Sequence, residues 1–234
     1  DKAVPVLATL VENGSIGEKQ AAFTALGALQ HPAAAALLGQ WLQKLDAGSV
    51  DAALHLDLLE AAQKHAVPAI AARLAARAEA EAKAGALAEF LACLEGGDPK
   101  AGRKVFFDDE AVRCTRCHAL QGQGGNAGPA LDGIGKRQTR NHLLESLIAP
   151  SAKIAEGFGS TTIELHDGNV IQGFVTKDQD GAVTVVGVNS DPHSVPWERI
   201  KSRASTSTSA MPPMGGALSR RQVRDVIAFL AEQQ

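Results

Sequence analysis

The sequence lacks the features that several protein classes require. None of its 234 residues belong to an apolar run of 18 or more, so no segment is long and apolar enough for a transmembrane helix. The net charge is only −3, and aromatic residues make up only 4% of the chain. No basic stripe or pair of stacking aromatic side chains stands out, so nothing in the composition indicates a nucleic-acid-binding protein.

Cysteine is also scarce, which narrows the interpretation of the pair Cys114 and Cys117. A structural zinc site needs four ligands and usually a second such pair, but only Cys93 remains. Zinc would therefore have to recruit scattered histidines. A thioredoxin-like dithiol is expected beside a βαβ pattern, and none surrounds Cys114. Cys93 lies in an apolar helical context, where we expect a buried, inert thiol.

The segment Cys114-Thr115-Arg116-Cys117-His118 is the most informative feature that is present. It is the attachment signature for c-type haem. The two sulfurs can form thioether bonds to the two vinyl groups of one haem, and His118 then lies under the iron as the proximal axial ligand. We therefore predict a redox protein with one covalently attached haem c, which carries the chemistry.

A haem-ligating histidine usually donates its other N–H to a carbonyl group. Pro129 lies eleven residues past His118, in a Gly-Pro-x-Leu turn. We expect the Pro129 carbonyl to accept this hydrogen bond.

The sixth ligand of the iron has several candidates. Methionine is a soft, neutral ligand that raises the reduction potential and suits electron transfer. Met211 is the best candidate because it lies in an irregular loop before the last helix, and Met214 is the alternative. The histidine candidates are His142 and His193.

The hydrophobic pattern divides the chain into three parts. Residues 1–96 are expected to be helical, with breaks at Asn13-Gly14, His31-Pro32 and Gly48-Ser49 and around Pro68. Short helices in antiparallel pairs are typical of HEAT-like repeats. The expected helices lie near 2–12, 18–30, 33–46, 50–65, 67–78 and 82–95.

The rest of the chain changes character twice. Residues 97–150 contain the attachment motif between two expected helices, with Asp98 as the N-cap of the first and Pro150 ending the second. In residues 158–203, apolar and polar side chains alternate with period two, and the turns Asp167-Gly168 and Asp180-Gly181 separate the expected strands. This pattern predicts a small antiparallel barrel. Its last strand is expected near 197–202, and residues 218–232 form a closing amphipathic helix.

Charge is distributed unevenly. Residues 1–97 have a net charge of −4, residues 98–140 around the motif have 8 basic and 5 acidic side chains, and residues 141–234 have −2. A basic rim around a haem edge could steer an acidic redox partner; a solvated surface without such a role is the alternative.

Residues 97–234 resemble the haem-binding domain of the Planctomycetes–Verrucomicrobia type, a cytochrome c with a β insertion. The resemblance rests on an ordered set of stretches: Gly97–Pro99 with Gly102 and Phe106, Cys114–His118, Gly128–Arg137, Pro150–Phe158, Asp167-Gly168, Ser209–Pro212 and the closing helix. Where this family often has Gly-Leu after Met-Pro, the chain has Pro213-Met214-Gly215.

The resemblance implies a mainly α, multi-domain chain. The expected domains are a HEAT-like domain at 1–96, a discontinuous cytochrome c core at 97–157 and 204–234, and a β insertion at 158–203. The insertion would shield a haem edge or dock a partner. The helix bearing Gly102 should cross the closing helix near Phe229, because glycine permits close approach.

The resemblance also implies His118 and Met211 as axial ligands in an electron-transfer module, with no catalytic residues of its own. Its electrons would come from a sugar-type dehydrogenase, as a partner or as a fused domain. The alternatives are a haem enzyme or a gas or redox sensor with a displaceable sixth ligand, and a protein-binding scaffold. The chain begins at Asp1 without a visible signal peptide, which we interpret as a mature form or an excised fragment. Covalent haem attachment implies export in bacteria, so we expect a periplasmic or otherwise exported protein.

Overall fold

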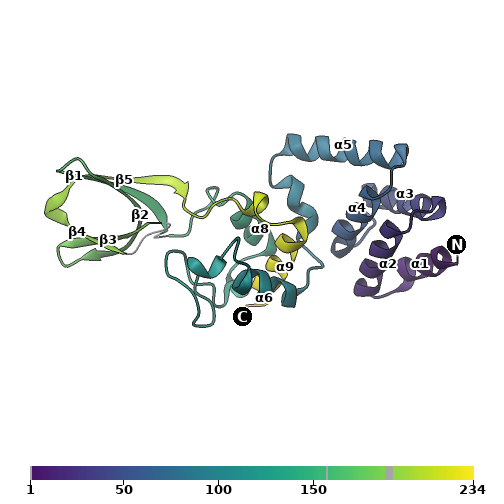
Figure 1. Cartoon of the computed structure of the whole chain (residues 1–234), viewed down its shortest axis with the longest axis horizontal. Helices are drawn as coiled ribbons and strands as arrows, with labels where there is room; N and C mark the ends of the chain where they lie inside the picture. Colours follow the sequence, from purple (N-terminus) through teal and green to yellow (C-terminus); the bar gives the residue numbers. More distant parts are fainter. Residues whose placement is uncertain (1, 157, 188–191) are drawn as a thin grey trace. The chain divides into compact units, whose positions relative to one another are not determined.

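The computed structural model describes residues 2–156, 158–187 and 192–234 and is mainly helical, with one antiparallel sheet (Figure 1). Its contacts divide the chain into two compact units, Asp1–Gly102 with Ser219–Phe229, and Arg103–Leu218 with Leu230–Gln234. The sequence predictions also cover Gly157 and residues 188–191 of the β insertion, and these residues lie outside the described ones. Within the described ranges, no helix has the length and apolar character needed to cross a membrane.

Short helices that follow one another build most of the first unit (Figure 1). They are α1 (Ala3–Asn13), α2 (Ile16–Ala28), α3 (Pro32–Asp46), η1 (Ala52–Leu54), α4 (His55–Gln63), α5 (Pro68–Ala84) and η2 (Ala88–Cys93), where η marks a 3₁₀ helix. The four predicted breaks, including the one around Pro68 between α4 and α5, each separate two of these helices, which confirms them. The predicted division into helices near 67–78 and 82–95 is wrong, because the stretch of Ala, Glu and Lys between them contains no helix breaker and α5 continues to Ala84.

The core of this unit forms where α1 packs on α2, and α2 and α3 pack on α4. Phe23 and Trp41 meet edge to face, with ring centroids 5.3 Å apart. Leu26 and Leu38 are fully buried beside them. Each such side chain contributes about 1.5–3 kcal/mol through the apolar surface that it removes from water.

Two further helices, α6 (Pro99–Asp108) and α9 (Arg220–Ala231), cross at a glycine. The predicted cap is present, because the Lys100 amide donates to Asp98 Oδ1 at 2.8 Å. A Cβ atom on Gly102 would lie 1.9 Å from the carbonyl oxygen of Asp225 and 2.9 Å from Phe229 Cβ. The predicted crossing of the two helices near Phe229 is therefore confirmed.

A buried ion pair also joins α9 to α4. The Asp57 carboxylate is 1% exposed. It accepts a hydrogen bond from the Arg224 guanidinium at 2.6 Å, and the Arg221 guanidinium lies 3.0 Å away. Arg224 itself is 5% exposed. Charged groups at this depth are stable only when they are paired, so this contact ties α9 to the helices of residues 1–97.

The second unit contains short helices and the sheet. Its elements are η3 (Cys114–Arg116), α7 (Ile134–Arg137), α8 (Arg140–Ile148), β1 (Gly159–Leu165), β2 (Val170–Gln179), β3 (Ala182–Val186), β4 (His193–Pro196), η4 (Trp197–Arg199), β5 (Ile200–Ser209) and η5 (Met214–Gly216). The predicted helix near 138–148 is confirmed as α8, and its leucines Leu143, Leu144 and Leu147 are buried.

The sheet is antiparallel, with strand order β4-β3-β2-β1-β5. Both predicted turns are present, with positive φ at Gly168 and Gly181. The predicted last strand near 197–202 is present as β5, but its bounds differ, because residues 197–199 form η4 and the strand runs from Ile200 to Ser209. The Ser- and Thr-rich end of this strand lies at the edge of the sheet, where polar side chains are tolerated, and Ala204, Ser205 and Thr208 are exposed.

The two edges of the described ladder are β4 and β5, and no pairing between them is described for residues 158–187 and 192–209. The sheet is nevertheless strongly curled. Arg203 on β5 donates to Asp178 near the end of β2 at 2.5 Å, although β1 separates these strands in the ladder.

Candidate haem-attachment site

The five residues of the attachment motif form one tight turn. Residues 114–116 are the 3₁₀ helix η3, and the amides of Cys117 and His118 both donate to the Cys114 carbonyl, at 3.2 and 3.0 Å. Both thiols are free and half-buried. The turn therefore presents two thiols and an imidazole from a single local structure.

The imidazole of His118 is held by the residue that the sequence singles out. The Pro129 carbonyl accepts from His118 Nδ1 at 2.8 Å. A carbonyl can only accept, so Nδ1 carries the proton and the lone pair of Nε2 remains free for a ligand.

Gly128 allows this approach. A Cβ atom at this position would lie 2.7 Å from Cε1 and 2.9 Å from Nδ1 of His118. The loop thus forms a close wall along the imidazole ring that no larger residue could make.

Backbone hydrogen bonds join this loop to the motif. The Gly128 amide donates to the Cys117 carbonyl at 2.8 Å, and the Leu131 amide donates to the Ala119 carbonyl at 2.9 Å. These bonds fix the position of the Pro129 carbonyl relative to His118.

The loop is also held from α7. The Arg137 guanidinium donates to the carbonyl groups of Asp132 at 2.6 Å and Ala130 at 3.3 Å. Sequence reasoning placed Arg137 only within a family-like stretch and gave it no role. The spacing of five and seven residues to its acceptors could not be read as a contact without the turn between them.

Burial sets the protonation states of the motif. It raises the pKa of Cys114 to about 11 and also raises the pKa of Cys117, so both thiols are protonated at neutral pH. Burial lowers the pKa of His118, although the hydrogen bond to Pro129 acts in the opposite direction. The imidazole is therefore neutral, as metal ligation requires.

The donor set of this turn fits a covalently held haem. It offers two adjacent thiols for the thioether bonds and a neutral imidazole with one free nitrogen, next to a glycine wall. In the described ranges, no group of three or more His, Cys, Asp or Glu side chains could hold a metal ion. The zinc interpretation of Cys114 and Cys117 thus has no ligand set there.

The candidate sixth ligands have different surroundings. Met211 follows β5 and is half-buried, whereas Met214 is buried at 8% exposure in η5, which packs against α8. Of the histidine candidates, His142 on α8 lies 3.8 Å from Glu145, and His193 is exposed on β4.

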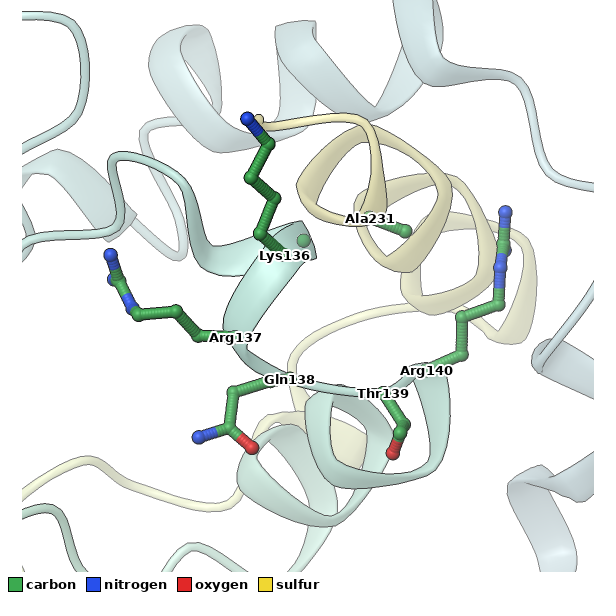
Figure 2. A pocket seen from close by; sticks show the side chains of 7 residues that line it. Lys136, Arg137, Gln138, Thr139, Arg140 and Ala231 are labelled. Carbon is green, nitrogen blue, oxygen red and sulfur yellow. The ribbon is translucent and has the colours of Figure 1, made fainter.

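A basic hollow of about 450 Å³ lies near the Arg137 loop (Figure 2). Its lining comes from α7, the start of α8 and the end of α9: Gly135, Lys136, Arg137, Gln138, Thr139, Arg140 and Ala231. Three of the eight cations that sequence analysis assigned to residues 98–140 gather here.

Comparison with known proteins identifies the central segment. The model of the Cytochrome c family matches residues 99–174, from the start of α6 into β2, including the attachment motif and Pro129. No curated protein matches the chain. The chain therefore contains a cytochrome c domain, which supports a haem-binding electron-transfer module with haem c.

Proposed function

We propose that this chain is a c-type cytochrome that carries one covalent haem, with His118 and Met211 as axial ligands. The observation that carries the proposal is the bond from His118 Nδ1 to the Pro129 carbonyl, made within the turn that contains both thiols. When bound, the haem supplies one-electron chemistry at its iron.

Each group of the site has a part in this function. The sulfurs of Cys114 and Cys117 tether the cofactor, and the neutral imidazole of His118 binds on one side. The Pro129 carbonyl orients the ring and increases the basicity of its other nitrogen. Burial of Met214 against α8 favours a packing role for this residue, which leaves the half-buried Met211 as the better ligand.

The wider assignment is part of the same proposal. The module is of the Planctomycetes–Verrucomicrobia type, with HEAT-like helices at residues 1–96 and a barrel-like β insertion. The successive packing of α1 on α2 and of α2 on α4 supports the first feature, and the curl that brings Arg203 to Asp178 supports the second. The protein acts in the periplasm or another exported location and receives electrons from a dehydrogenase. The basic hollow around Lys136 and Arg140 suits an acidic redox partner.

The test is the Met211→Ala variant of the chain, produced in a host that attaches haem c. Intact mass should show one haem on both the wild type and the variant. We expect the variant to lose the sulfur–iron charge-transfer band and its reduction potential to fall by on the order of 0.1 V, within the ~0.8 V that axial ligands span. Absorption spectra and a redox titration measure both effects.

Met214→Ala is the matched control and should keep the band. If Met211→Ala leaves the band unchanged and Met214→Ala removes it, the ligand assignment is wrong. A bare polypeptide mass for the wild type would refute covalent attachment altogether.

A further inference from the structure

The sheet of the β insertion extends past the expected boundary at residue 203 and ends close in sequence to the proposed sixth ligand. Its last strand, β5, stops at Ser209, two residues before Met211, and its first strand, β1, begins at Gly159. These two strands pair with each other, and Gly159 lies opposite Ser209. The excursion of the chain into the sheet therefore leaves and returns at one place, beside Met211.

The pairing is irregular just before this point. Between two successive pairs of the ladder, β1 advances from Gly159 to Thr161, whereas β5 spans Ser205 to Ser209. Such bulges release a strand from its regular register and redirect the residues that follow. The strand end then depends on other contacts for its position.

Two serine hydroxyls supply these contacts. The Ser209 amide donates to Ser151 Oγ at 3.0 Å, and the Met211 amide donates to Ser209 Oγ at 3.1 Å. Ser151 belongs to the turn that follows α8. A chain of two hydrogen bonds thus runs from this turn to the backbone of Met211.

The residues after Met211 cannot replace this anchor. Pro212 and Pro213 have no backbone N–H, so the Met211 amide is the last backbone donor before Met214. Their fixed φ angles stiffen the segment but do not tie it to the fold. The serines therefore hold the only backbone donor that the Met211-Pro212-Pro213 segment possesses.

We propose that Ser151 and Ser209 are positioning residues which, with the β1–β5 pair, clamp the loop that carries Met211. Loss of the clamp frees the loop and makes the sixth position accessible to external ligands. This inference rests on the proposed function, because it takes Met211 as the ligand. It also gives the β insertion a role that differs from shielding a haem edge or docking a partner.

The physical basis is loop entropy. When a ligand lies on an ordered loop, its binding to the iron loses little conformational entropy. When the loop is loose, each binding event must also order the loop, which costs free energy. The net contribution of one such hydrogen bond corresponds to about five-fold in an equilibrium constant. An external ligand that competes with Met211 should gain by this factor when a serine hydroxyl is removed.

The experiment titrates the oxidised holoprotein with imidazole and measures the apparent dissociation constant from the loss of the charge-transfer band. We expect Ser151→Ala and Ser209→Ala each to bind imidazole about five-fold more tightly than the wild type. Ser209→Thr keeps a hydroxyl and should restore the wild-type value. The control is Ser205→Ala, on the same strand and exposed, which should leave the constant unchanged.

The outcomes distinguish a failure of the serine clamp from a failure of the Met211 ligand assignment. If Met211→Ala removes the band but Ser151→Ala and Ser209→Ala behave like Ser205→Ala, the clamp is refuted and the ligand assignment stands. If Met211→Ala keeps the band, the proposed ligand fails first. The free energy of unfolding is measured in parallel; if the gain in imidazole affinity simply follows a general loss of stability that Ser205→Ala shares, the clamp is also refuted.

Discussion

Single residues around His118 position the imidazole through steric fit and hydrogen bonds and take no part in chemistry themselves. Gly128 leaves room for the imidazole ring, Pro129 accepts its N–H, and Arg137 holds the backbone on the far side of the same loop. None of these contacts depends on a long-range arrangement, because all three residues follow His118 within 19 positions. The ligand geometry is therefore sensitive to very small changes in this loop.

Gly128→Ala tests this sensitivity. The added Cβ would overlap the His118 ring, so the loop or the imidazole must shift, and we expect the holoprotein to lose about 1–3 kcal/mol of unfolding free energy. Denaturant titration of the haem-containing protein measures this loss. Gly216→Ala is the control, because a Cβ there meets nothing within 4 Å. Equal stability of the two variants would show that the glycine wall has no such role.

At the scale of elements, glycine decides how closely helices approach. The resemblance to the haem-binding family predicted that α6 crosses α9 near Phe229, and the structure shows why a glycine is needed there, because only a residue without a side chain permits this backbone contact. The strands were predicted less well. The polar stretch at 204–209 looks like a loop in sequence, since edge strands do not show the alternation of a half-buried strand.

Gly102→Ala should force α6 and α9 apart, because the new Cβ would lie 1.9 Å from the Asp225 carbonyl oxygen. We expect a loss of about 3 kcal/mol in the free energy of unfolding. Gly39→Ala in α3, where the Cβ meets nothing, should instead stabilise by about 0.5–1 kcal/mol through helix propensity. Chemical denaturation of both variants compares them; a neutral Gly102→Ala would contradict the close crossing.

At the scale of the whole molecule, the two compact units do not coincide with the segment that matches the Cytochrome c model. Most of α9, through Phe229, belongs to the unit built from residues 1–102, and the buried Asp57–Arg224 pair joins it to α4. The upstream helices and the C-terminal helix therefore form one core.

Asp57→Asn should destabilise the protein strongly, because it removes the nearer counter-charge of the buried Arg224 guanidinium, at 2.6 Å, and leaves only the Asp225 carboxylate at 3.8 Å. We expect a cost of about 3–5 kcal/mol. Asp46→Asn also removes a carboxylate that pairs with an arginine, but its side chain is 43% exposed and the expected cost is about 0–1 kcal/mol. Thermal and denaturant unfolding of the full chain distinguish the two cases. Similar small losses for both variants would mean that α9 does not depend on the upstream helices.

The sequence by itself was enough to predict the candidate attachment site, because the two thiols, the imidazole and the Pro129 turn follow one another within 16 residues and their spacing carries the chemistry. It also determined most helix boundaries, since capping residues, glycine and proline act locally. Only the tertiary structure decided which distant groups support this site. Ser151 meets Ser209 across 58 positions and Asp57 meets Arg224 across 167. Such contacts arise from strand register and helix packing, which depend on all the surrounding side chains at once rather than on any local pattern.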